Sequence, residues 1–200
     1  MKSPDTLIFD LSEVFIAGLR GIEPIIAARL CIDEASVSRG LTCLHLHELF
    51  RGNITEDAYL QTLHDDNGWA LSTDDLKQII RQNFHHRVPG MDDLLPRLRD
   101  KYRVFLLSDH VREWIEYIKT IHPFLEQFNA QFFSFHLKQT KRDPSTFSRV
   151  LASVQRDAAD CIFVDDSERN VAAASSVGIP SIHFVSAAQL QADLRQMGIL

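Results

Sequence analysis

Short apolar runs that end in polar residues recur along the chain, and they define its predicted strands. The first run leads directly into Asp10, and the second leads into Ser108. Runs of this length, without alternation, are typical of strands buried on both faces of a parallel sheet. We predict five such strands, at residues 6–9, 103–107, 130–135, 161–164 and 180–185.

Segments with helical spacing separate these strands in the second part of the chain. We expect helices over residues 91–101, 111–121, 168–177 and 187–197, and a further helix that begins at Asp143 and Pro144. Asp is favoured at a helix N-cap and Pro at the first helical position. Strands that alternate with helices imply parallel β-α units. The predicted fold class is therefore α/β, a doubly wound, five-stranded Rossmann-like core with strand order 3-2-1-4-5.

Residues 15–87 have a different pattern, with helix signals and no convincing strand. Asp33 is a suitable cap for a helix that runs toward Phe50, and Thr55 and Ser72 each precede acidic residues of a first helical turn. We therefore predict an all-helical cap domain at 15–87, inserted into a core domain made of 1–14 and 88–200.

Composition narrows the possible partners. The chain has 200 residues, of which 45% are apolar and 24% charged, and none of its apolar runs approaches the length of a membrane span. Three scattered cysteines predict no disulfide framework, which favours a cytoplasmic location. The net charge of −6 argues against nucleic-acid or membrane partners, so an anionic substrate would need a local cation. The sequence does not determine the oligomeric state.

Polar residues stand where the predicted strands end. Asp10, Ser108 and the pair Asp165-Asp166 each follow a strand, and Lys141 precedes a helix. The carboxyl ends of parallel strands share one edge of a sheet, where such folds bind ligands. Adjacent carboxylates repel each other without a cation, and an oxygen-only set suits Mg²⁺. A helix cap with a first-turn acid is the alternative interpretation of the aspartate pair.

Four segments together resemble the haloacid dehalogenase superfamily of Mg²⁺-dependent phosphohydrolases, in the class with a helical cap. They are residues 9–14, 106–109, 141–147 and 163–167, and the likeness continues through residues 170–179. Their order and spacing agree over residues 6–184. Among these relatives, the chain looks most similar to small sugar-phosphate phosphatases that lack the second acid of the first motif. The resemblance implies a small phosphorylated metabolite as substrate.

The resemblance also implies roles for individual residues. Asp10 would be the nucleophile that forms an aspartyl-phosphate. Mg²⁺ would be held by Asp10, by the backbone carbonyl of Ser12 and by the Asp165-Asp166 pair, with Asp166 as the expected direct ligand. Phosphoryl transfer depends chiefly on this kind of positioning and charge neutralisation.

The phosphate would be bound by three further residues in this comparison. Ser108 would donate a hydrogen bond to it, backbone N–H groups around Asp109 would help, and Lys141 would supply a second positive charge. Lys138 is a nearby alternative to Lys141, although the spacing to Asp143-Pro144 favours Lys141.

Ser12 departs from the pattern, because most phosphatases of this superfamily carry a general acid–base Asp at that position. Loss of such a group typically costs ~10²–10⁴ in rate. Three interpretations remain open: slow turnover, replacement by another group such as Glu13 or His110, or a non-catalytic binding protein. Asp109, where relatives often have Asn, adds negative charge near the predicted phosphate site.

Two other chemistries are conceivable. A metal-independent 2-haloacid dehalogenase would also lack the second acid, but Asp165-Asp166 would be a burden there, which favours phosphate chemistry. Cys43 and His47 are four residues apart and would share a helix face, so a zinc site is possible, although their spacing matches no standard zinc pattern.

Overall fold

A five-stranded parallel sheet forms the centre of the molecule, and its strand order is β3-β2-β1-β4-β5. The computed structural model describes residues 4–200, so residues 1–3 of the predicted core segment lie outside the described residues. The strands are β1 (Thr6–Phe9), β2 (Arg103–Ser108), β3 (Ala130–Phe133), β4 (Cys161–Asp165) and β5 (Ser181–His183). The predicted fold class and strand order are confirmed.

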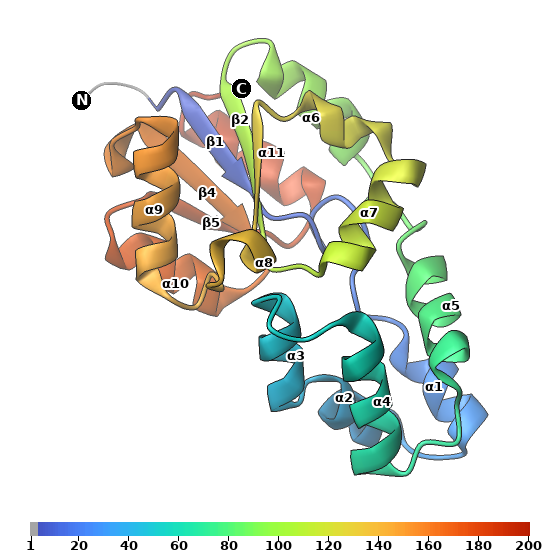
Figure 1. Ribbon diagram of the computed structural model, residues 1–200. Coiled ribbons are helices and arrows are strands. Elements are labelled where there is room, and N and C mark those ends of the chain that lie inside the picture. Colours follow the sequence, from blue (N-terminus) through green and yellow to red (C-terminus); the bar gives the residue numbers. More distant parts are fainter. Residues whose placement is uncertain (1–3) are drawn as a thin grey trace.

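Side chains of the central strand alternate between two hydrophobic layers. Leu7 and Phe9 pack in one layer with residues of the helices on that face, whereas Ile8 packs in the other. The first layer includes α6 (Met91–Arg99), α7 (Arg112–Ile121) and α11 (Ala187–Gln196), and the second includes α9 (Pro144–Val154) and α10 (Glu168–Ser176). Figure 1 shows these two groups of helices on opposite sides of the sheet. Burial on both faces explains why the strands are continuous apolar runs.

Helices fill the region between β1 and α6. They are α1 (Glu23–Leu30), α2 (Glu34–Leu41), α3 (Leu44–Phe50), α4 (Glu56–Asn67) and α5 (Thr73–Asn83). Asp33, Thr55 and Ser72 accept hydrogen bonds from the backbone N–H groups of the first turns of α2, α4 and α5, as their sequences predict. In Figure 1 these helices lie beyond the arrowheads of the strands, on the side where the polar strand-end residues emerge.

The helix predicted from Asp33 to Phe50 is wrong in one respect, because the chain breaks between α2 and α3. The Thr42 hydroxyl donates to the carbonyl of Ser38, and helix α3 begins after Cys43. Gly40 lies against Trp69, and a Cβ atom there would stand 2.6 Å from the indole ring. Close packing between distant segments therefore accompanies this break.

Two strand boundaries also differ from the prediction. The third strand ends at Phe133, because Ser134 begins the short helix α8 (Ser134–Leu137) and donates its hydroxyl to the carbonyl of Phe50. The fifth strand covers only Ser181–His183. The remaining short elements are two 3₁₀ turns, η1 (Pro123–Gln127) and η2 (Ala158–Asp160).

The two connections between α1–α5 and the sheet run side by side. Ala17 donates its backbone N–H to His86 at 2.9 Å, and Val88 donates to Phe15 at 3.0 Å. Isolated bridges also pair Ile16 with Ser12 and with Arg87. The chain thus leaves and re-enters the core at one place, directly after Asp10.

Glu56 joins three helices at the boundary between α1–α5 and the core. Its side chain is 3% exposed, it forms a two-pronged ion pair with Arg81 of α5, and it accepts the indole N–H of Trp114 of α7 at 2.6 Å. A buried carboxylate is stabilised only while such partners surround it.

We expect Glu56→Ala to lower the free energy of unfolding by about 3 kcal/mol, because it leaves the Arg81 guanidinium and the Trp114 N–H without their partner. Urea denaturation measures this change. The matched control is Glu116→Ala, which removes an exposed carboxylate from α7. Equal stability of the two variants would contradict this account of Glu56.

Candidate active site

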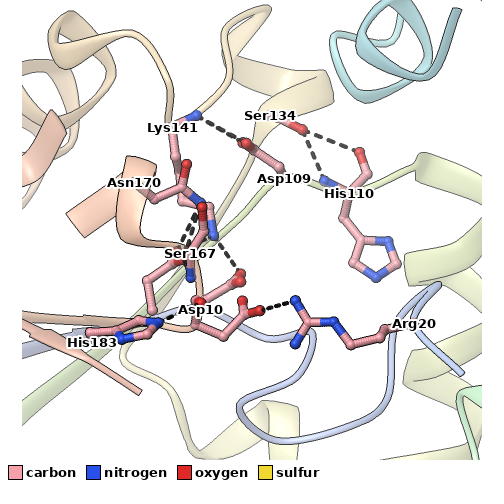
Figure 2. A network of polar contacts seen from close by, with 11 residues as sticks. Asp10, Arg20, Asp109, His110, Ser134, Lys141, Ser167, Asn170 and His183 are labelled. Carbon is pink, nitrogen blue, oxygen red and sulfur yellow. Dashed lines mark hydrogen bonds and ion pairs between the residues drawn. The ribbon is translucent and has the colours of Figure 1, made fainter. Parts of the chain in front are cut away.

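Lys141 is the centre of the polar cluster at the carboxyl edge of the sheet. Its ammonium lies 2.6 Å from Asp10 Oδ1 and 2.6 Å from Asp165 Oδ2, and its side chain is 1% exposed. Burial lowers the pKa of Lys141, but Asp10, Asp165 and Asp109 together outweigh this effect and raise it. Figure 2 shows the lysine reaching from its loop toward these acids. The ammonium is therefore held in its charged form.

Asp109 fixes the backbone of the lysine loop. Both of its carboxylate oxygens accept the backbone N–H of Lys141, at 3.0 and 3.1 Å. Burial raises the pKa of Asp109 to about 6, and the positive charge of Lys141 opposes that rise. The side chain thus connects the end of β2 to the loop before α9. The contact predicted between phosphate and the backbone N–H groups around Asp109 stays a prediction.

Asp165 is oriented by three donors. Besides the lysine ammonium, its carboxylate accepts the backbone N–H of Ser167 at 2.8 Å and the Asn170 amide at 3.1 and 3.2 Å. Asn170 is buried on the first turn of α10. No role for Asn170 was predicted from the sequence, although a position about one helical turn beyond a strand-end acid is where such a support would be sought.

Three carboxylates gather around one point. Asp10, Asp165 and Asp166 each offer an oxygen atom, and these atoms lie within 4.8 Å of one another. Burial raises the pKa of Asp10 to about 8, where the attraction of Lys141 lowers it and the two other acids raise it. Burial and then Asp165 also raise the pKa of Asp166. Buried, oxygen-only donors of this kind fit Mg²⁺.

Arg20 contacts this cluster from the segment before α1. Its guanidinium lies 3.0 Å from Asp166 Oδ2, and its side chain is largely exposed. Its pairing with Asp166 joins residues that are 146 positions apart, which no local pattern indicates.

Ser108 and Ser12 have different environments. Ser108 is fully buried at the end of β2, and its hydroxyl has no hydrogen-bond partner within residues 4–200. Ser12 is partly buried, and Gly18 approaches it so closely that a Cβ atom there would lie 2.8 Å from the Ser12 Cβ. An orphaned buried hydroxyl is the kind of group that a bound anion would satisfy.

Glu13 follows Ser12 in a left-handed backbone conformation, with φ of 61°. Its carboxylate accepts the backbone N–H of Gly18 at 2.9 Å, and burial raises its pKa. A non-glycine residue at positive φ is uncommon and costs free energy. The Glu13 side chain remains at the cavity wall, where it is one possible substitute for the missing acid.

His110 is buried between aromatic rings. Its ring centroid lies 5.8 Å from that of Phe84 and 5.7 Å from that of Trp114. Nδ1 accepts the backbone N–H of Val111 at 3.0 Å, which leaves the proton of the neutral imidazole on Nε2. Burial, aided by the nearby charge of Lys141, lowers the pKa of His110 to about 3. Both features oppose its use as a general base.

A cavity of about 390 Å³ opens over this edge of the sheet. Of the predicted site residues, Asp10, Ser12, Asp109, Lys141 and Asp166 line it, together with His110 and Glu13. Ser108 and Asp165 are not part of the lining; both are fully buried at their strand ends. The structure therefore brings the predicted residues to one place.

The possible zinc pair is arranged differently. His47 Nε2 lies 2.9 Å from the guanidinium of Arg142, and Cys43 Sγ lies 3.9 Å from His45 Nδ1. Within residues 4–200, the one group of three or more potential metal ligands is the aspartate cluster. The Cys43–His47 pair thus lacks the further ligands that a zinc site needs.

The doubly wound sheet and the acidic edge with its buried lysine define the class of protein. Residues 36–184 match the family described as haloacid dehalogenase-like hydrolase, and the chain belongs to that family. The superfamily expected from the motifs is thereby confirmed. The narrower likeness to sugar-phosphate phosphatases stays a prediction.

Two curated relatives are named as phosphate-ester hydrolases. The chain is 26% identical over 153 residues to flavin mononucleotide hydrolase 1 of Arabidopsis thaliana, covering 76% of this chain and 61% of the relative. It is 28% identical over 108 residues to the sesquiterpene phosphatase astK of Aspergillus oryzae, covering 54% of this chain and 55% of the relative. The chain thus spans less than two thirds of the length of these relatives.

Solved structures share the fold over nearly the whole chain. One is a haloacid dehalogenase family enzyme of Bacteroides thetaiotaomicron in complex with magnesium and inorganic phosphate, 25% identical, with a TM-score of 0.69 and coverage of 92% of this chain and 96% of that one. A 2-haloacid dehalogenase of Pseudomonas syringae is 14% identical, with a TM-score of 0.58 and coverage of 96% and 99%. Within the described part of the chain, none of the helices is long and apolar enough to cross a membrane.

The His110 environment predicts how stability depends on pH. The folded-state pKa is about 3 against an ordinary value of 6.5, so the unfolded chain binds the extra proton first and stability falls as the pH drops below 6.5. On acidification to about pH 5, protonation of His110 should lower the free energy of unfolding of the wild type by about 2 kcal/mol. We expect this decrease to be absent in His110→Gln. Urea denaturation as a function of pH measures it, with exposed His86→Gln as the control. Parallel pH profiles for wild type and His110→Gln would refute the assignment.

Proposed function

We propose that the protein is a Mg²⁺-dependent phosphatase that hydrolyses a small phosphorylated metabolite through a phosphoryl group on Asp10. The observation that carries this proposal is the Lys141 ammonium between Asp10 and Asp165, together with the orphaned hydroxyl of Ser108 at the end of β2. Phosphoryl transfer needs fixed positive charge and donors around the equatorial oxygens. The names of the two phosphatase relatives support the same chemistry.

The aspartate cluster supplies the metal ligands in this proposal. Asp10, Asp166 and the backbone carbonyl of Ser12 hold Mg²⁺, which neutralises charge on the phosphate. Asp166 suits direct ligation better than Asp165, because Asp165 already accepts hydrogen bonds from Lys141 and two further groups, whereas Asp166 has Arg20 as its ion-pair partner. The Bacteroides structure with magnesium and phosphate supports the choice of ion.

The chain's own residues position the phosphate. The Ser108 hydroxyl and the Lys141 ammonium donate to its oxygens, while Asp10 attacks phosphorus and the alcohol of the substrate leaves. Water then cleaves the aspartyl-phosphate and releases inorganic phosphate. Because Asp109 holds the Lys141 backbone, its loss would displace the ammonium as well as alter the local charge.

Residues 15–87 act as a cap in this proposal. Their two connections to the core run side by side, and the cavity lies between α2, α3 and α5 on one side and the sheet edge on the other. Lids that exclude water commonly turn on such short connections. The Arg20–Asp166 ion pair would then be made or broken as the cap moves.

Because residue 12 is a serine and not an acid, a second candidate function is that of a non-catalytic binding protein. Serine is a poor proton acceptor near neutral pH, so a binding protein that retained the fold would explain it. Tight ligand binding without turnover across a panel of phosphate esters would favour that candidate. A metal-independent dehalogenase fits less well, because it would have no divalent cation to balance the negative charge that remains around Asp10, Asp165 and Asp166.

The central prediction concerns metal and nucleophile. We expect hydrolysis of an aryl phosphate and of a metabolite panel to require Mg²⁺, to stop with EDTA, and to fall at least ~10³-fold in Asp10→Asn, which removes the attacking carboxylate. Phosphate release measures it, with exposed Asp157→Asn at the opposite end of β4 as the control. Activity that survives EDTA or the Asp10 substitution rules the mechanism out.

The missing acid predicts a change in rate-limiting step. An aryl phosphate has a good leaving group and needs little proton donation, so hydrolysis of the aspartyl-phosphate should become slow without a strong base at residue 12. We expect a burst of aryl alcohol followed by slower turnover, and a ~10-fold or larger gain in the steady rate of Ser12→Asp. Stopped-flow absorbance measures both.

Ser12→Asn is the matched control, because it has the size of Asp without its basicity. No burst, combined with a Ser12→Asp variant slower than wild type at saturating Mg²⁺, would show that another residue already performs the proton transfer. Glu13 would be the next to test, since burial disfavours a protonated His110.

A further inference from the structure

The cavity over the sheet edge has a second side that the phosphoryl chemistry does not use. Five apolar side chains line it, from α2, α3 and α7 and from the residue that directly follows α5. We call them the apolar wall: Leu41, Leu46, Phe50, Phe84 and Trp114. Phe50 is partly exposed, and the other four are at most 7% exposed, so the wall is a fixed part of the core.

The polar atoms of the aromatic part of this side are already engaged. The indole N–H of Trp114 donates to Glu56 at 2.6 Å, so the ring presents carbon to the cavity. The Nδ1 of His110 accepts the backbone N–H of Val111, and only the Nε2–H of its neutral ring is left for a bound molecule. The aromatic residues therefore offer a bound molecule one hydrogen-bond donor.

Two further polar side chains of this side, Thr42 directly after α2 and His47 on α3, are engaged at one atom each. The hydroxyl of Thr42 donates to the carbonyl of Ser38 at 2.8 Å, and Nε2 of His47 accepts from the Arg142 guanidinium at 2.9 Å. Of the side chains of α2 and α3 that line the cavity, this leaves the Ser38 hydroxyl and the Nδ1–H of the His47 ring for a ligand. A polyhydroxylated ring placed here would lose its water without finding enough partners, which costs free energy at each hydroxyl.

From this arrangement we infer that the substrate is the phosphate monoester of an apolar alcohol of about ring size, and not a sugar phosphate. The inference rests on the proposed phosphatase function and adds the class of alcohol to it. The phosphate lies at the charged edge near Lys141, and the organic group packs on the apolar wall. The free energy gained by burying apolar surface then distinguishes esters of apolar alcohols from sugar phosphates.

Two phosphate esters of the same shape test this directly. Cyclohexylmethyl phosphate and glucose 6-phosphate each join a primary alcohol to a six-membered ring, so they differ mainly in their hydroxyl groups. We expect kcat/KM for the cyclohexylmethyl ester to exceed that for the sugar ester by ~10-fold or more. Equal values, or a preference for the sugar ester, would overturn the inference.

A pair of variants on one helix shows where the preference arises. Leu46→Gln places an amide in the apolar wall, whereas Leu44→Gln makes the same change at a side chain of α3 that is 83% exposed. We expect the ratio of the two kcat/KM values to fall ~10-fold or more in Leu46→Gln and to keep its wild-type value in Leu44→Gln. An unchanged ratio in an active Leu46→Gln variant would contradict a role of the wall, and the wild-type comparison stands if that variant does not fold.

Acetyl phosphate separates this inference from the function on which it rests. It is small and activated, so it probes the charged edge with little use of the wall. Mg²⁺-dependent hydrolysis of acetyl phosphate without a preference between the two ring esters would refute the inference alone. Failure to hydrolyse acetyl phosphate and both esters would refute the phosphatase proposal and the inference with it.

Discussion

The buried ammonium of Lys141 is the interaction on which the catalytic edge depends. A lone ammonium in this position would be very unfavourable, and two carboxylates at 2.6 Å make it stable. Those carboxylates come from the ends of β1 and β4, and the lysine backbone is held by Asp109, which follows β2. One residue thus connects the ends of three adjacent strands, β1 and β4 through its ammonium and β2 through its backbone N–H, and the strand order is what allows it.

Negative charge still exceeds positive charge at this edge. Within residues 4–200, the four carboxylates of Asp10, Asp109, Asp165 and Asp166 face the positive charges of Lys141, of the exposed Arg20 and of Arg142, which acts on Asp109. The raised pKa values of Asp10, Asp109 and Asp166 have burial as their main cause, and the neighbouring carboxylates raise them further. A divalent cation has the charge that would restore the balance, which is an electrostatic reason, independent of any relative, to expect a metal here.

The sequence predicted the parts of the fold that local patterns control. Continuous apolar runs located the strands, and side-chain chemistry located the caps at Asp33, Thr55 and Ser72. The break between α2 and α3 was missed, because it accompanies packing of Trp69 against Gly40, and that contact is tertiary. The end of β3 was missed for a similar reason, since the Ser134 hydroxyl bonds to a carbonyl in another part of the chain.

In the candidate site, too, local sequence patterns predicted some features, whereas others depend on tertiary contacts. Strand ends in a parallel sheet must converge, so Asp10, Ser108 and Asp165 could be grouped from their positions alone. The apolar wall could not be predicted in this way, because helical spacing indicates that Leu46 or Phe84 is buried but not that either side chain faces a cavity. The charged edge comes from the sheet and its loops, whereas the wall comes from α2, α3, the end of α5 and α7. In the function that we propose, electrostatics therefore fix the phosphoryl group in one half of the cavity, while packing in the other half selects the alcohol.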